Sequence, residues 1–140
     1  MCSGATSGWR RHAAGQCAPG VWRSSAVRAW GLEIQCADPA VYSPVLTGVM
    51  MPEGIDADVV RRNIYDRFNM SLGAALGKMK GRMFRIGHLG DCNDLTLMAT
   101  LAGCEMGLKV SGVPVAASGT SAAMDYLAAH ATPLQLKVAA

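Results

Sequence analysis

The sequence predicts an α+β domain in which helices pack on one side of a small, mostly antiparallel sheet. Two observations support this class. The 140 residues are 51% apolar and 16% charged, which is enough apolar material for one core in a domain of this size. Helical and extended segments follow one another in the order helix, strand, helix, strand, strand, helix, helix, which is typical of an α+β domain.

The first three elements follow from the spacing of apolar residues. Residues 22–30 place two tryptophans and an alanine on one helical face, with Ser24 or Ser25 near the helix start. Residues 42–51 are a nearly continuous apolar run closed by Pro-Glu-Gly, which is typical of a buried strand. Residues 56–68 begin with aspartates that can cap a helix, and an apolar stripe follows them.

The remaining elements are two extended segments and two helices. Residues 70–76 and 83–89 have extended character and are joined by a turn rich in lysine and glycine. An aspartate or asparagine within residues 91–94 can cap the clearest helix, whose apolar face repeats at i, i+4, i+7 and i+11 from Leu97. A last helix covers residues 120–129.

Composition divides the chain into three parts. Residues 1–23 are rich in glycine, serine and arginine, lack carboxylates and show no apolar period, so we expect an unstructured or unrelated stretch. A displaced start of the coding sequence would account for this stretch equally well, whereas an organelle transit peptide is less favoured because of the glycines. Residues 24–130 form the predicted domain, and residues 131–140 a loose tail. We expect a cytoplasmic location.

Charge and cysteine usage argue against several kinds of partner. The net charge of +3 is too small to indicate a polyanionic partner, and we interpret Arg61, Arg62 and Arg67 as a solvated helix face. The five cysteines and three histidines show no zinc-ligand spacing, which favours reduced thiols. No apolar run reaches the roughly 18 residues of a membrane span. We therefore expect no nucleic acid, no membrane and no metal.

One segment, residues 84–90, carries a chemical signal. Arg85 lies between two apolar residues in an extended segment, so its side chain points to the face opposite theirs. If its neighbours face the core, Arg85 faces a cleft or a partner domain, where a guanidinium can hold a carboxylate with two parallel hydrogen bonds. Gly87 and Gly90 allow the backbone to bend or to approach another group closely. The alternative is an arginine paired with a structural carboxylate at a sheet edge.

The same segment resembles a known family. Phe84-Arg-Ile-Gly-His-Leu-Gly90, followed by Asn93-Asp-Leu-Thr-Leu97 and Glu105-Met-Gly-Leu108, resembles the small C-terminal domain of class-V pyridoxal-phosphate aminotransferases of the serine–glyoxylate or alanine–glyoxylate kind. Upstream motifs resemble it in the same order: Val27-Arg-Ala-Trp-Gly-Leu-Glu-Ile34, Tyr42-Ser-Pro44, Pro52-Glu-Gly54 and Met70-Ser-Leu-Gly73. The likeness runs from about residue 26 to about residue 127, and the arginine segment is its most specific part.

The resemblance implies a role for Arg85. It implies that Arg85 binds the α-carboxylate of a small amino acid or oxo acid, with the backbone of Gly87, His88 and Gly90 in support. The family's cofactor is pyridoxal phosphate, joined as a Schiff base to a lysine of the large N-terminal domain, and its whole enzymes are typically homodimers. His88 could reach the active site or a neighbouring subunit, but we favour a satisfied structural histidine.

The chain departs from the family because that large domain has no counterpart in it. The four lysines, Lys78, Lys80, Lys109 and Lys137, have no context for a cofactor lysine, and no glycine-rich phosphate loop opens a helix. We therefore expect a fragment of an aminotransferase that transfers an amino group from serine or alanine to glyoxylate. We expect it to bind no cofactor and to be inactive alone. The alternative is a stand-alone module that binds a small carboxylate.

Overall fold

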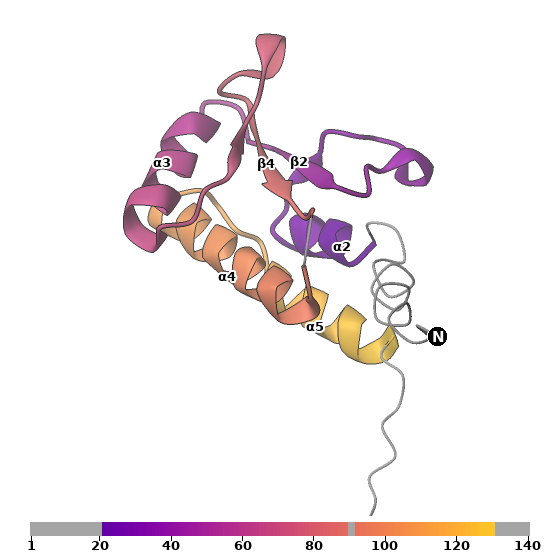
Figure 1. The fold of residues 1–140 in the computed structure, drawn as a ribbon. Coiled ribbons are helices and arrows are strands. Elements are labelled where there is room, and N and C mark those ends of the chain that lie inside the picture. Colours follow the sequence, from indigo (N-terminus) through magenta and orange to yellow (C-terminus); the bar gives the residue numbers. More distant parts are fainter. Residues whose placement is uncertain (1–20, 90–91, 131–140) are drawn as a thin grey trace, which may run out of the picture.

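Residues 21–89 and 92–130 are described by the computed structural model, which confirms the α+β class (Figure 1). Four antiparallel strands form one sheet in the order β1-β2-β4-β3. The strands are β1 (Glu33–Ile34), β2 (Leu46–Met50), β3 (Gly73–Ala74) and β4 (Met83–Gly87). The helices are α2 (Val21–Ala29), α3 (Ala57–Phe68), α4 (Asp94–Val110) and α5 (Gly119–His130), with 3-10 turns η1 (Pro39–Val41) and η2 (Gly77–Met79). The expectations for residues 1–20 and 131–140 lie outside the described residues.

The core lies between the helices and one face of the sheet. In Figure 1, α4 and α5 run below the strands and α3 lies to their left. Val49 of β2 and Phe84 and Ile86 of β4 join this core, where they meet helix residues such as Leu101 and Leu108 of α4. Because side chains alternate along a strand, the residues between them project to the other face of the sheet.

The strands differ from their predicted lengths. The predicted strand at 42–51 begins only at Leu46, because residues 39–41 form η1 and the chain then turns, with Val45 N donating to Ser43 Oγ at 3.3 Å. Pro44 has no N–H to give to a ladder, which shortens the strand further. The predicted extended segment at 70–76 contributes only two residues, and β1 was not predicted at all.

Asp56 and Asn93 are the residues that cap the starts of α3 and α4. Asp56 caps α3, since its Oδ1 accepts from Asp58 N at 2.8 Å. Asn93 caps α4 through a reciprocal pair: its Oδ1 accepts from Thr96 N at 2.9 Å, and Thr96 Oγ1 accepts from Asn93 N at 3.0 Å. These bonds satisfy N–H groups that a helix start would otherwise leave open. The Asn93 cap fixes where α4 begins after the arginine segment.

Two glycines allow helices to pack closely. A Cβ at Gly107 of α4 would overlap the Ile64 side chain of α3. A Cβ at Gly119 of α5 would overlap the carbonyl oxygen of Ala26 and the Trp30 ring. Both glycines are buried, so α3 and α5 can lie this close to their neighbours only because glycine has no side chain.

Candidate functional site

Arg85 lies in the middle of β4, on the sheet face opposite the core. Its ladder partners are Gly48 on β2 and Gly73 on β3, so a glycine flanks it on each side. Met83 and Gly87, two residues away along the strand, share its face. Phe84 and Ile86 face the core, which is the condition under which the sequence analysis directs Arg85 to a cleft or a partner domain.

Arg85 makes no hydrogen bond or ion pair with a described residue. Its Nε is buried and has no partner, although the residue as a whole is partly exposed. The ion pairs of the described residues are Arg61–Asp58 and Lys109–Glu105, and neither involves β4. The alternative of a structural ion pair therefore has no partner among residues 21–89 and 92–130. An arginine that is unpaired and partly exposed on the non-core face of a sheet can bind an anionic ligand.

His88 does not join Arg85. Its Nδ1 lies 3.0 Å from Pro44 O and its Nε2 lies 3.1 Å from Thr47 Oγ1, and the residue is 7% exposed. A carbonyl oxygen only accepts, so Nδ1 carries a proton. Thr47 alternates with Gly48 and lies on the core-facing side of β2. These two contacts link His88, after β4, to Pro44 before β2 and to Thr47 in β2.

The other residues of the segment add little chemistry. A Cβ at Gly87 would meet nothing within 4 Å, so no close approach to a described atom requires this glycine. Gly90 lies outside the described residues.

Two cysteines outside this segment also have defined surroundings. Cys92 Sγ donates to Leu89 O at 3.6 Å, and burial raises the pKa of the Cys104 thiol to about 12. Cys104 therefore stays protonated and unreactive at neutral pH.

Apolar side chains extend the open face at the end of the sheet near Gly87. Leu46 pairs with Gly87, and His88 N donates to Val45 O at 3.0 Å, so the start of β2 and the end of β4 lie together. Val45, Leu46 and Leu89 are all exposed here, Leu89 to 72%.

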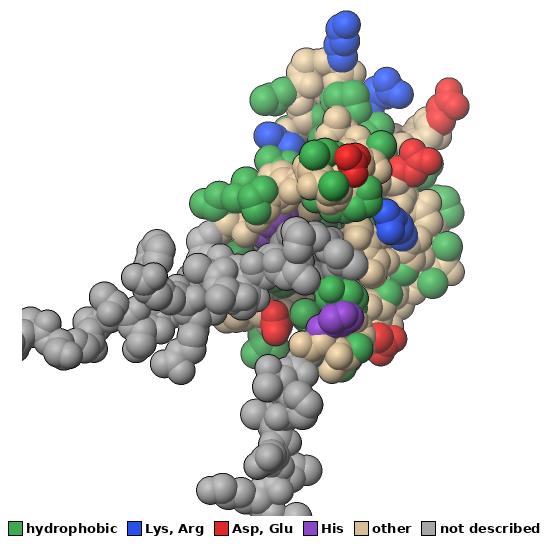
Figure 2. Space-filling view, turned by 90° about the vertical axis from the view of Figure 1, so that its right-hand side faces the viewer, with side chains coloured by type: hydrophobic (Ala, Val, Ile, Leu, Met, Phe, Trp, Pro, Cys, Tyr) green, Lys and Arg blue, Asp and Glu red, His purple; other side chains and the backbone are tan. Residues whose placement is uncertain are grey.

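On the face shown in Figure 2, lysine and arginine side chains of the described residues lie apart, with apolar and acidic side chains between them. These basic side chains therefore form no continuous surface on that face.

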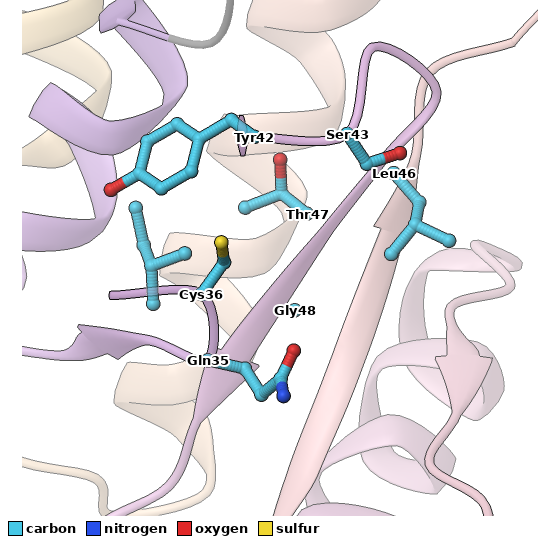
Figure 3. A pocket seen from close by; sticks show the side chains of 8 residues that line it. Gln35, Cys36, Tyr42, Ser43, Leu46, Thr47 and Gly48 are labelled. Atoms are coloured by element: carbon cyan, nitrogen blue, oxygen red, sulfur yellow. The ribbon is translucent and has the colours of Figure 1, made fainter. Parts of the chain in front are cut away.

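A small cavity lies beside the open face. It measures about 60 Å³ and lies between β2 and the preceding loop (Figure 3). Cys36 points toward the space between Tyr42 and Thr47 in that view. A volume of this size holds about two water molecules and not an amino acid, and Arg85 is not among the residues that line it.

The clearest ionised group is Glu105, whose role the sequence analysis missed. Glu105 is 6% exposed, and its Oε2 accepts from Trp30 Nε1 (3.1 Å), Ser118 Oγ (3.2 Å), Thr120 N (3.0 Å) and Thr120 Oγ1 (2.9 Å). Its spacing of i+4 from Leu101 and i−3 from Leu108 places it on the buried face of α4, and this was the available signal. Glu105 therefore joins α4 to α5 and to Trp30.

Hydrogen bonding keeps Glu105 ionised. Burial disfavours the charged form and by itself would raise the pKa of this carboxyl. Hydrogen bonds from Lys109, Thr120 and Trp30 outweigh burial and lower the pKa from its ordinary value of 4.5 to about 2. Because its partners are all structural, Glu105 stabilises the helix packing and is not a ligand site.

The described residues do not fit a bound pyridoxal phosphate. Lys78 and Lys80 are exposed around η2, and Lys109 Nζ is engaged with Glu105 Oε1 at 2.8 Å. Lys137 lies outside the described residues.

Within residues 21–89 and 92–130, no group of three or more His, Cys, Asp or Glu side chains could hold a metal ion. In the same residues, no helix has the length and apolar character needed to cross a membrane.

Comparison with known proteins connects this site to a family. No family model matches the chain. The serine–glyoxylate aminotransferase of Methylorubrum extorquens is 45% identical over 103 residues, 73% of this chain and 26% of the relative. That of Arabidopsis thaliana is 46% identical over 106 residues, 75% of this chain and 26% of the relative.

A solved structure gives the same result. The pyridoxamine–pyruvate aminotransferase of Mesorhizobium loti has a TM-score of 0.75 and 27% identity, over 88% of this chain and 31% of that one. The chain spans about a quarter of the length of the curated relatives that it matches. It matches the C-terminal part of class-V aminotransferases, which confirms the family resemblance of the arginine segment.

Proposed function

We propose that this chain supplies the substrate-carboxylate arginine of a pyridoxal-phosphate aminotransferase that uses serine or alanine and glyoxylate. The observation that carries the proposal is Arg85, unpaired on the open face of the sheet between Gly48 and Gly73. A guanidinium in this setting binds a carboxylate through two parallel charge-assisted hydrogen bonds. Arg85 is the substrate-binding residue in this proposal.

The names of the relatives support the carboxylate as the shared ligand. Serine, glyoxylate and pyruvate, named for those three proteins, each carry a carboxylate next to the reacting carbon. Arg85 would hold that group and so fix the orientation of the reacting carbon, which lowers the entropic part of the barrier. Selection among amino donors would fall to other residues, because every candidate oxo acid or α-amino acid presents the same carboxylate to Arg85.

The proposal also assigns the cofactor chemistry to a domain other than this one. Pyridoxal phosphate supplies the electron-withdrawing ring for amino transfer in such enzymes. The described lysines are solvated or hydrogen-bonded to Glu105, so they do not offer a Schiff-base partner. We infer that the chain has no transaminase activity on its own, and that its arginine acts only beside a cofactor-holding domain.

A chimeric enzyme tests the role of Arg85. Residues 24–130 would replace the matching C-terminal part of the Methylorubrum extorquens enzyme, and serine–glyoxylate transamination would be measured. Arg85→Lys keeps the charge but removes the planar pair of donors that binds both carboxylate oxygens. We therefore expect kcat/KM to fall by about 10- to 100-fold. Arg62→Lys, on the exposed side of α3, is the matched control and should change it by less than about twofold. Equal rates for the Arg85 variant and the unmodified chimera would refute the proposal.

Titration of the full chain separates the alternative, a stand-alone carboxylate module. Serine, alanine and glyoxylate would be added to the chain in a calorimeter. Saturable binding in the micromolar range, abolished by Arg85→Ala, would favour the stand-alone module, because such affinity does not need a second domain wall. Saturable but weak binding, in the millimolar range, is the result that the fragment predicts.

A further inference from the structure

The Arg85 side chain rests on a neighbouring glycine. A Cβ built on Gly73 would lie 3.1 Å from Arg85 Cβ, 3.3 Å from Arg85 Nε and 3.4 Å from the Arg85 carbonyl oxygen. Gly73 belongs to β3, the edge strand that pairs with β4 at Arg85. The arginine side chain therefore runs across Gly73 toward the edge of the sheet, over a position that has no side chain.

In this position the nitrogen atoms of the Arg85 guanidinium differ in their exposure to solvent. Arg85 Nε is buried without a partner, while Arg85 as a whole is partly exposed, so the exposed part lies elsewhere on the side chain. A carboxylate can meet an arginine side-on, through Nε and one terminal nitrogen, or end-on, through Nη1 and Nη2. Side-on binding requires access to Nε, which is buried where the Arg85 side chain lies over Gly73.

We propose that Gly73 is a positioning residue that makes Arg85 bind its carboxylate end-on, through Nη1 and Nη2. The inference rests on the proposed function, since it specifies how the same arginine meets its ligand. Any side chain at 73 displaces Arg85 by a few tenths of an ångström, because the contacts at 3.1 and 3.3 Å are tighter than ordinary packing. An Arg85 side chain that leaves its place over residue 73 to relieve these contacts exposes Nε and adopts a second orientation.

Gly48 provides a matched control on the other side of Arg85. It pairs with Arg85 from β2 and lies on the same face of the sheet. A Cβ at Gly48 would meet Met83 Cε at 2.8 Å and Gln35 Cβ at 3.2 Å, and no Arg85 atom is among its nearest neighbours. The Met83 side chain ends in a flexible thioether that can move away. Gly48→Ala thus makes the same chemical change in the same row without touching the arginine.

Arginine side-chain NMR of the full chain tests the inference. The Nε–H signal of Arg85 would be assigned by its loss in Arg85→Lys, and its exchange with solvent measured. We expect slower exchange than for exposed arginines such as Arg62, and an increase of about tenfold in Gly73→Ala, because burial protects the proton. Gly48→Ala should leave the exchange rate unchanged. Fast exchange in the unmodified chain, or an equal effect of both glycine variants, would overturn the role of Gly73.

Titration with sodium glyoxylate in the same spectra tests the binding geometry. End-on binding should shift the Nη signals of Arg85 and leave Nε–H in place, and Gly73→Ala should lower the affinity by about tenfold, or about 1.4 kcal/mol. A large shift of Nε–H in the unmodified chain means side-on binding and overturns the inference alone. No shift at any Arg85 nitrogen at saturating glyoxylate counts against the proposed function, and the inference falls with it.

Discussion

Trp30 Nε1 donates a hydrogen bond of 3.1 Å to Glu105 Oε2, joining two buried residues that are 75 positions apart in the sequence. Trp30 follows α2, and Glu105 lies in α4, while the remaining donors to the same oxygen come from the start of α5. One carboxylate oxygen thus holds together three segments that carry no part of the arginine site. The stability of the domain can therefore be changed without touching Arg85.

Replacing Glu105 by Gln should destabilise the domain by about 2–4 kcal/mol. The amide oxygen can accept the four bonds now made to Oε2 only without the negative charge that strengthens them, and the amide nitrogen would face Lys109 Nζ. Urea unfolding followed by circular dichroism measures this change. Lys109→Met is the control: its side chain is 57% exposed, so losing the ion pair should reduce the free energy of unfolding by less than about 1 kcal/mol. Equal effects of the two variants would contradict the central role of Trp30 and α5.

The same carboxylate should make stability depend on acid pH. The pKa of Glu105 is about 2 in the folded chain against an ordinary 4.5, so its contribution is fully present above pH 4.5. It is lost as the pH falls from 4.5 toward 2, which should remove about 1–3 kcal/mol of unfolding free energy. Thermal melts across this range should show a smaller loss for Glu105→Gln than for the unmodified chain. Parallel curves would contradict the prediction.

Gly119→Ala should destabilise the domain by about 2 kcal/mol or more, because the new methyl group meets the Ala26 backbone, which cannot rotate away. The nearest atoms to a Cβ at Gly107 are γ and δ carbons of the Ile64 side chain, so the effect of Gly107→Ala should shrink when Ile64→Ala removes them. Urea unfolding of the single and double variants gives both values. A rescue of Gly119→Ala by the same Ile64 change would show that these contacts are not the cause.

His88 should exist as the tautomer with its proton on Nδ1, because that nitrogen faces the carbonyl oxygen of Pro44. Long-range proton–nitrogen spectra identify the tautomer directly. Thr47→Val removes the partner of Nε2 and should destabilise the domain by about 1 kcal/mol. A predominant Nε2–H form would mean that this loop is arranged differently.

Pyridoxal phosphate followed by borohydride should give no stoichiometric adduct at a single lysine of this chain. The described lysines are solvent-exposed or bound to Glu105, so we expect sparse labelling spread over several of them. Intact mass and peptide mapping distinguish the outcomes. One fully labelled lysine would mean that the chain forms its own cofactor site.

Local patterns predicted the helices and the outward direction of Arg85. The apolar repeat from Leu97 indicated α4, and alternation around Arg85 indicated its face, since both patterns depend only on residues near in sequence. The pairing register of the strands could not be predicted from such local patterns. The two glycines that flank Arg85 come from strands 37 positions before and 12 positions before it, and only strand pairing brings them together.

The missed features have similar physical causes. β1 spans two residues, too few for a periodic signal to distinguish it from a loop. The apolar run before Leu46 resembled a strand, but Pro44 and the turn at Ser43 end the ladder there. Glu105 was visible on the apolar face of α4, yet its donors lie in other segments, so its environment could not be derived from the helix alone.

The position of Arg85 on β4 has a mechanical consequence. β4 has a paired strand on each side, so a force applied at the guanidinium is shared between two ladders and does not bend a loop. If Arg85 holds a ligand, as we propose, a displacement of the arginine is passed to both neighbouring strands, because each of them is paired with β4.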